Sequence, residues 1–224
     1  ALALLEAGFE RKRDRARMER LHEVGRALAS EQNLDRLLDL ILTRARGLLG
    51  AEAGSLYLVD VTEEGPLLLF AHTQNARVSL PYHRFHMPIS RSSMAGFVAS
   101  TGESINIPDV YRIPEEAPYR FNESYDRQCG YRSTSMLVVP LKDTEGEVLG
   151  VLQLINRREE EGSAVEPFRR EHADLAESLA GQAGVAVKNA KLRGDIERLF
   201  EHFVNASILA IEQRDPVTSG HSGR

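Results

Sequence analysis

A long aromatic-rich segment, residues 108–131, contains the side chains best suited to bind a small molecule. Between Pro108 and its end, it carries the aromatic residues Tyr111, Tyr119, Phe121, Tyr125 and Tyr131. A segment of this length between two strands is more often a binding loop or a lid than a plain connection. The sequence therefore predicts a lid over a pocket, and we call residues 108–131 the lid.

Histidine and cysteine residues offer less chemistry. His83 and His86 lie in an extended stretch, where residues three apart point to opposite faces and cannot hold one metal ion together, so we interpret both as structural. Cys129 is the single cysteine, which excludes an internal disulfide and suits a reducing cytoplasm. It could be redox-active, but a lone cysteine is more often inert, and no nucleophile, base and orienting residue fall together. A small-molecule enzyme is therefore the weakest of the functions considered.

The bulk composition is that of a globular domain with helical extensions. The chain has 224 residues, of which 42% are hydrophobic and 27% charged. A net charge of -5 gives no indication of a nucleic-acid partner. No apolar stretch approaches the roughly 20 residues that cross a bilayer. We expect a cytoplasmic location, with no membrane segment in this piece.

Two hairpins are predicted in one sheet, and the second of them, within residues 132–156, is its predicted centre. Residues 53–60 and 67–72 read as strands joined by a turn, and within 132–156 two apolar runs flank a charged, glycine-containing loop. The runs of the second hairpin are apolar on both faces, so we expect both faces of the sheet to be covered. Shorter extended pieces are predicted at 85–89 and at 104–107.

Three helices are predicted around this sheet. Asn33 is expected to cap the first, which carries leucines on one face and ends near Gly50. A short helix over 92–100 could receive a phosphate on its N-terminal amides, although an ordinary capped helix is the simpler interpretation. Glu166 begins a very long helical pattern that reaches about Gln213.

Coiled-coil seams are predicted at both ends of the chain. Beyond the charge-dense stretch 10–20, Met18, Leu21, Gly25 and Leu28 recur at alternating spacings of three and four. A heptad seam on the long helix comprises Val185, Asn189, Leu192, Ile196, Leu199, Phe203, Ala206 and Ala210. One small sheet cannot bury so long a helix, so we predict a parallel homodimer.

Several stretches resemble the GAF domain family, namely GSLYLVD, MAGFVASTGESINIPDVY, GYRSTSMLVVPL, GEVLGVLQLINR and LAGQAGVAVKNAKL. The resemblance covers about residues 21–192. It implies an α+β sandwich with a six-stranded antiparallel sheet, helices on one face, and a small-molecule pocket under loops on the other. Together with the seams, it divides the chain into an N-terminal dimerisation helix (1–30), a GAF domain (31–192), and a linker helix with the start of a further domain (193–224).

Residues 104–135 look most like GAF domains of cyclic-nucleotide phosphodiesterases and adenylyl cyclases. Those domains carry an Asn-Lys, Phe, Asp signature, and Asn106, Phe121 and Asp126 stand where its Asn, Phe and Asp would fall. The lysine is missing, because Ile107 and Pro108 occupy its neighbourhood. A salt bridge of the kind that closes the lid in nucleotide-binding relatives is therefore in doubt.

A purine ligand needs an aromatic wall and a few donors and acceptors, which Phe85, Tyr125, Asp126 and Thr134 could supply. The predicted ligand-binding residues are thus Phe85, Asn106, Phe121, Tyr125, Asp126 and Thr134. Cys129 is followed by Gly130 rather than by the histidine that accompanies the attachment cysteine in many tetrapyrrole-binding relatives. We expect no covalent chromophore and no cofactor in this piece.

Residues 199–224 resemble the opening helix of the HD-GYP phosphodiesterase domain, a metal-dependent hydrolase associated with cyclic di-GMP. The resemblance implies that His221 belongs to a metal centre of iron or manganese in a complete domain. The other ligands would follow Arg224, so this piece should hydrolyse nothing.

These observations favour the sensory half of a bacterial signalling phosphodiesterase. In this interpretation a small ligand, with cAMP or cGMP as candidates, binds the GAF domain, and the long helix of the homodimer passes the ligand state to the HD-GYP domain. The alternative is an unliganded GAF dimerisation module.

Overall fold

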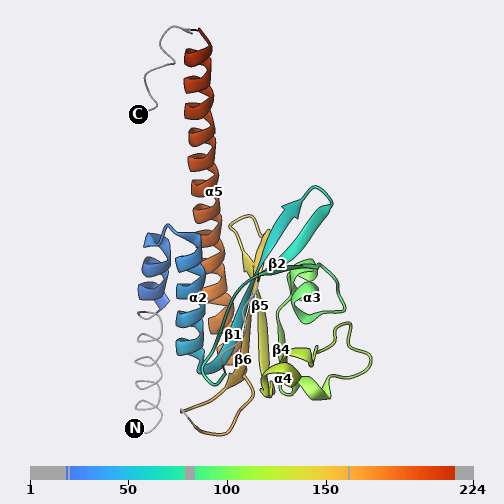
Figure 1. Ribbon diagram of the computed structural model, residues 1–224. Coiled ribbons are helices and arrows are strands. Elements are labelled where there is room, and N and C mark those ends of the chain that lie inside the picture. Colours follow the sequence, from blue (N-terminus) through green and yellow to red (C-terminus); the bar gives the residue numbers. More distant parts are fainter. Residues whose placement is uncertain (1–18, 20, 79–83, 161, 215–224) are drawn as a thin grey trace.

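The structure, a computed structural model, describes residues 19, 21–78, 84–160 and 162–214 and contains one six-stranded antiparallel sheet (Figure 1). Its strands are β1 (Ala51–Thr62), β2 (Gly65–Asn75), β3 (Phe85–Pro88), β4 (Ile105–Ile107), β5 (Met136–Lys142) and β6 (Val148–Arg157). Their order in the sheet is β3-β2-β1-β6-β5-β4. The predicted fold class and both predicted hairpins are confirmed.

One face of the sheet is covered by helices. They are α2 (Leu34–Leu49), α5 (Arg170–Arg214) and a helical segment of which residues 21–30 are described. The Asn33 side chain caps α2 by accepting a hydrogen bond from the Arg36 amide at 3.0 Å, and Gly50 ends α2 in the left-handed conformation with φ of 65°. Leucine and alanine side chains of α2 and α5 interlock there with every second residue of the central strands. We call this side of the sheet the helix-covered face.

The opposite face carries shorter elements. The helix α3 (Met94–Thr101), a 3-10 turn η1 (Val110–Arg112) and the helix α4 (Ser124–Cys129) lie over it. Ser93 caps α3 through a hydrogen bond from the Gly96 amide at 3.0 Å. The residues of β5 alternate between the two faces: Leu137, Val139 and Leu141 join the core of the helix-covered face, and Met136 and Val138 join the smaller core of this second side. This alternation explains why the strand is apolar throughout. We call this second side the cavity face.

One predicted boundary is wrong, and the lid contains structure that was not predicted. The long helix begins at Arg170 rather than at Glu166, because Glu166 pairs with β6 in an isolated bridge to Arg157 and its carboxylate contacts the Arg157 guanidinium at 2.5 Å. The lid contains η1 and α4, neither of which was predicted from the sequence. A helix as short as α4 lacks the repeated apolar spacing from which a helix is predicted in a sequence.

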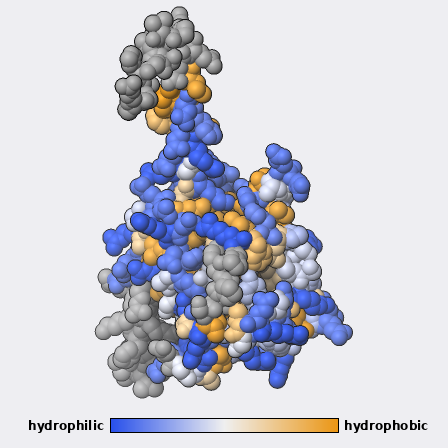
Figure 2. All heavy atoms as spheres, viewed as in Figure 1, coloured by the Kyte–Doolittle hydropathy of each residue, from blue (hydrophilic) through white to orange (hydrophobic). Residues whose placement is uncertain are grey.

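The outer half of α5 leaves the domain, and no other described segment of the chain covers it (Figure 1). Several of the predicted heptad positions are exposed: Leu192 is 50% exposed, Ile196 67%, Leu199 68% and Phe203 69%. Figure 2 shows hydrophobic side chains gathered near the upper end of the described part of this helix. Within the described ranges, no helix combines the length and the apolar character needed to span a membrane.

Several predictions fall on residues outside the described ranges. These are the metal role of His221, the structural role of His83, the charge-dense stretch 10–20 apart from Glu19, and the seam position Met18. The division of the chain into 1–30, 31–192 and 193–224 also stays a prediction.

Candidate ligand-binding cavity

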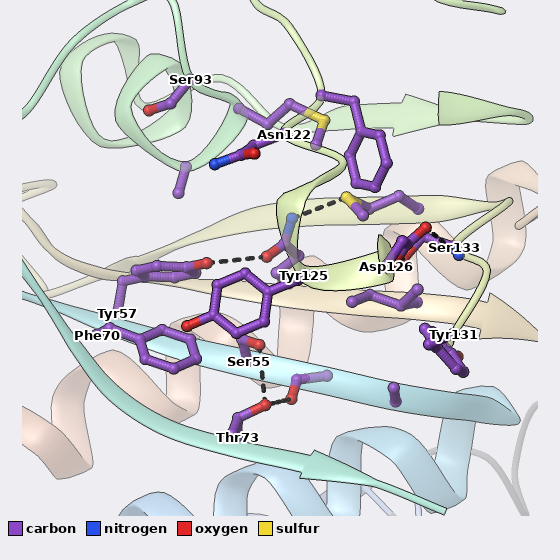
Figure 3. A pocket seen from close by; sticks show the side chains of 18 of the residues that line it. Ser55, Tyr57, Phe70, Thr73, Ser93, Asn122, Tyr125, Asp126, Tyr131 and Ser133 are labelled. Atoms are coloured by element: carbon purple, nitrogen blue, oxygen red, sulfur yellow. Dashed lines mark hydrogen bonds between the residues drawn. The ribbon is translucent and has the colours of Figure 1, made fainter. Parts of the chain in front are cut away.

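A cavity of about 200 Å³ lies on the cavity face of the sheet, between the strands and the lid (Figure 3). Strands β1, β2, β5 and β6 form its floor. The N-terminus of α3, the lid residues 120–122 and the helix α4 form its walls.

An aromatic cluster centred on Phe70 makes one wall of the cavity. The ring centroid of Phe70 lies 5.2 Å from that of Tyr57, 5.1 Å from that of Phe85 and 6.2 Å from that of Tyr125. Phe70 is 4% exposed, whereas Phe85 and Tyr125 are 39% and 38% exposed and border the mouth. Such tilted rings offer a flat apolar surface on which a planar ligand can stack.

A polar row crosses the floor of the cavity. Ser55 on β1 is the register partner of both Thr73 on β2 and Gln153 on β6, so the three side chains lie side by side. The Thr73 hydroxyl donates to the Gly54 carbonyl at 3.1 Å, so in the Ser55–Thr73 contact at 3.2 Å the Ser55 hydroxyl is the donor. The lone pairs of Ser55 Oγ therefore remain available to accept a hydrogen bond from a ligand.

The Gln153 amide supplies the complementary group. Its Oε1 accepts from the Tyr57 hydroxyl at 3.2 Å, and burial raises the pKa of Tyr57, so that this hydroxyl keeps its proton. Its Nε2 lies 2.7 Å from the sulfur of Met136, and a thioether is a weak acceptor. The floor thus presents an amide donor next to a hydroxyl acceptor.

Asp126 is a buried carboxylate on α4 that protein groups already surround. It accepts from the Tyr111 hydroxyl at 2.8 Å, from the Ser133 amide at 2.7 Å and from the Ser133 hydroxyl at 2.8 Å. Asp126 is 6% exposed. These contacts tie α4 to both ends of the lid, so bracing is the role that the geometry gives Asp126.

Residues 33–187 match the family model described as GAF domain. The chain belongs to the GAF domain family. This GAF protein is 30% identical over 183 residues to dual 3',5'-cyclic-AMP and -GMP phosphodiesterase 11 of Drosophila melanogaster, a match that covers 78% of the chain but only 12% of the fly protein.

Two solved structures show the same fold. The GAF domain of a phosphoenolpyruvate-protein phosphotransferase from Coxiella burnetii has a TM-score of 0.60 and 22% identity, and the match covers 80% of this chain and 96% of that one. Free methionine-R-sulfoxide reductase of Neisseria meningitidis, solved with its substrate, has a TM-score of 0.58 and 20% identity, with coverages of 79% and 91%.

The structure brings four of the six predicted ligand-binding residues to the cavity of this GAF domain. They are Phe85, Phe121, Tyr125 and Asp126. Phe85 comes from β3, Phe121 from the lid, and Tyr125 and Asp126 from α4, so segments distant in sequence meet here.

Asn106 does not line the cavity. Its neighbours on β4, Ile105 and Ile107, point into the core of the cavity face, so strand alternation turns Asn106 to the other side. There its Nδ2 donates to the Phe168 carbonyl at 2.9 Å, just before α5 begins. Asn106 therefore links β4 to the approach of α5.

Thr134 does not line the cavity either. Its amide donates to Asn156 Oδ1 at 2.7 Å, and its carbonyl accepts from the Val110 amide at 2.9 Å. Both contacts use the backbone and fasten the start of the lid next to β5.

A polar network braces one end of the cavity at Tyr131. The Tyr131 hydroxyl donates to Glu52 Oε1 at 2.9 Å and accepts from Asn156 Nδ2 at 2.9 Å. Arg158 Nε and Arg77 Nε lie 2.5 Å and 3.0 Å from Glu52 Oε2. Burial works to raise the pKa of Glu52, but hydrogen bonds from Arg158, Tyr131 and Arg77 outweigh it and hold that pKa below its ordinary value. The ionised Glu52 therefore keeps the Tyr131 ring in place.

Other candidate chemistry lies away from the cavity. Cys129 is half-buried at the last residue of α4 and is not among the lining residues. His86 Nε2 contacts Asp60 Oδ2 at 2.8 Å, in agreement with a structural interpretation. In the part of the chain that the structure describes, no cluster of His, Cys, Asp and Glu side chains could hold a metal ion.

The floor residues Ser55, Tyr57, Thr73 and Gln153 were missed from the sequence. A signal existed for Ser55 and Gln153, because each is a polar residue between apolar neighbours on its strand, whereas Thr73 lies in the polar end of β2. Only the strand register shows that they lie in one row.

Proposed function

We propose that this GAF domain is a sensor of a small planar ligand, and that cyclic purine nucleotides are the ligand class. The observation that carries the proposal is the donor–acceptor pair of Gln153 Nε2 and Ser55 Oγ beneath an aromatic wall. A purine edge presents a donor and an acceptor side by side, as adenine does with its amino group and adjacent ring nitrogen. Its rings would stack beside Phe70 and Tyr125.

The N-terminus of α3 suits the phosphate of such a ligand. Ser93, Met94 and Ala95 line the cavity at the start of this 8-residue helix. Free amides and the positive end of the helix dipole favour an anion there. The cavity is smaller than the roughly 300–1,000 Å³ of typical ligand sites, so binding of a whole nucleotide would move the lid outward.

The similarity to the fly phosphodiesterase supports the same ligand class, since that protein's name gives cyclic AMP and cyclic GMP as what it acts on. The missing signature lysine is the feature that separates this chain from the nucleotide-binding pattern. We therefore base the proposal on the cavity floor rather than on the signature.

A homodimer is proposed to transmit the ligand state of the GAF domain along α5. Two copies would pair in parallel along the exposed seam on α5, which includes Ile196, Leu199 and Phe203. Ligand binding would favour one packing of this seam only if the two packings differ in affinity for the ligand. In a longer bacterial protein the helix would control an HD-GYP phosphodiesterase of cyclic di-GMP, with His221 among its iron or manganese ligands.

Calorimetry with cAMP, cGMP and cyclic di-GMP tests the ligand proposal. Gln153→Met and Ser55→Ala should each weaken binding of the nucleotide that binds best roughly ten- to hundredfold, because each removes a buried polar contact. Ser100→Ala is the matched control, since Ser100 is an exposed serine on α3 whose hydroxyl bonds to the Phe97 carbonyl at 3.0 Å. No heat and no thermal shift with any of the three nucleotides would contradict the proposal.

The second candidate is an unliganded dimerisation module. The exposed apolar seam on α5 favours it, because pairing of two copies along this seam requires no ligand. Sedimentation tests the dimer common to both candidates: Phe203→Glu should convert a dimer to monomers, while the exposed control Glu201→Gln should not. If the unmodified chain stays monomeric at high concentration, both the dimer and the proposed signal transmission through α5 are contradicted.

A further inference from the structure

The lid is fastened at both of its ends to one side chain. Tyr111 lies on η1 near the start of the lid, and Ser133 lies just past the end of the lid and shortly before β5, so these two residues flank the segment that carries α4. Both donate to the Asp126 carboxylate, at 2.8 Å from the Tyr111 hydroxyl and at 2.7 Å and 2.8 Å from Ser133. The middle of the lid is fixed separately, since the Arg120 amide donates to the Ser92 carbonyl at 2.8 Å.

We propose that Tyr111, Asp126 and Ser133 form a latch that holds α4 over the cavity with protein groups alone. All three donors to Asp126 are neutral, so the latch holds this carboxylate without an ion pair. Tyr111 and Ser133 are positioning residues. They hold α4 where the ring of Tyr125 closes the cavity beside Phe70.

The surroundings of Tyr111 favour this role. Its ring packs edge-on against Phe121 at 5.2 Å, and the Arg132 guanidinium lies over the ring at 4.2 Å from the centroid. Burial and the Asp126 carboxylate raise the pKa of Tyr111, so the hydroxyl keeps the proton that it donates. The ring is thus held from two sides while the hydroxyl points at Asp126.

The latch deepens the proposed function, because on that proposal its opening would admit the ligand. The latch itself can be tested without any ligand, and failure of nucleotide binding would leave its test intact. A hydrogen bond to a charged group strengthens local structure more than a neutral one does. Loss of the Tyr111 hydroxyl should therefore raise the population of a locally opened α4.

Amide hydrogen exchange, followed by mass spectrometry on peptides covering 120–135, is the test. Tyr111→Phe keeps the ring contacts and should speed exchange of the α4 amides roughly ten- to hundredfold, with the sheet amides of β1 and β6 unchanged. Ser133→Ala keeps the backbone donor and should give a smaller acceleration, about threefold. Tyr119→Phe is the matched control on the same lid, because Tyr119 contacts Phe97 through its ring at 5.2 Å.

Three outcomes would overturn the latch. The first is exchange in Tyr111→Phe within about twofold of the unmodified chain. The second is an acceleration spread evenly over the whole sheet, which would mean a general loss of stability. The third is an equal effect of Tyr119→Phe. The neutral donors also predict that the ratio of α4 exchange rates between Tyr111→Phe and the unmodified chain changes little between about 0.01 M and about 1 M salt, since the exposed Arg127–Glu123 ion pair at α4 is present in both chains.

Discussion

The two faces of the sheet are built from the same strands but are filled in different ways. On the helix-covered face, the side chains of Leu37, Ile41 and Leu42 on α2 are completely buried, and α5 adds small alanines that allow close approach. On the cavity face, aromatic rings and a polar row surround a hollow of about 200 Å³. The comparison indicates that one face is filled by a close-packed core, whereas the other keeps an open cavity.

The largest expected loss of stability comes from a substitution in the helix-covered face. Leu42→Ala should lower the free energy of unfolding by about 3 to 4 kcal/mol, because it leaves a hole among side chains that cannot relax to fill it. Leu42 is 0% exposed and packs next to Gly54 on β1. Urea unfolding measures the loss. Leu40→Ala, at a half-buried position of the same helix, is the control and should cost less than half as much unfolding free energy. Equal losses for the two variants would mean that the helix-covered face is not a close-packed core.

The next largest effect is on the cavity face. Asp126→Ala should cost about 2 to 3 kcal/mol of unfolding free energy without any ligand, since it leaves the Tyr111 hydroxyl and the Ser133 amide without their acceptor. Thermal unfolding measures this as a drop of several degrees. Asp126→Asn keeps an acceptor oxygen and should lose less. An unchanged melting temperature for Asp126→Ala would return Asp126 to the role of a ligand contact.

A smaller effect, in acid, concerns the ion pair that joins the β5–β6 hairpin to α5. Asp143 accepts from Lys188 Nζ at 2.6 Å and from the amides of Glu145 and Glu147 at 2.9 Å each. The hydrogen bond from Lys188, together with these amides, lowers the pKa of Asp143 despite its burial. An aspartate with a lowered pKa stabilises the fold fully above its unfolded pKa of about 3.9, and this stabilisation is lost as the pH falls through the folded pKa.

The stability of Lys188→Met should therefore fall less steeply below about pH 4 than that of the unmodified chain. The urea midpoint at a series of pH values measures this difference. Lys191→Met is the control, because Lys191 Nζ donates to the Val59 carbonyl at 2.9 Å rather than to a carboxylate. If the midpoint of Lys188→Met falls as steeply in acid as that of the unmodified chain, the Asp143 pair does not stabilise this side of the fold.

Local patterns were enough to predict α2 and the hairpins of the helix-covered face. They were wrong for Leu21 and Leu28, which were assigned to a dimer seam but are buried in the core of this face against residues of the same chain. Leucine spacing marks α2, the cap at Asn33 marks its start, and apolar runs mark both hairpins. These signals work because helices and strands are defined by neighbours in sequence. The GAF fold itself came from the resemblance of whole stretches rather than from periodicity.

The cavity face was predicted only in part, for physical reasons that concern particular residues. Asn106 was assigned to the site by its match to a signature, although alternation with Ile105 and Ile107 already turns it away from the cavity. Ser55 and Gln153 meet through strand register, which one sequence does not reveal. The partners of Asp126 depend on how the lid folds back, and such contacts leave no local pattern.

The smallest expected effect on stability sharpens the comparison within the cavity face itself. Tyr125→Leu should change the free energy of unfolding by less than about 1 kcal/mol, because the ring is 38% exposed and touches the aromatic cluster only at 6.2 Å. Phe70→Leu, at the 4% exposed centre of that cluster, should cost about 1 to 1.5 kcal/mol through the loss of its ring contacts with Tyr57, Phe85 and Tyr125. Urea unfolding of both variants separates the two positions. A loss for Tyr125→Leu as large as that for Phe70→Leu would mean that the mouth of the cavity is part of the core. In the expected order, replacing Tyr125 costs the fold little. A fall in nucleotide affinity in Tyr125→Leu would then come from the loss of a ligand contact and not from a loss of stability.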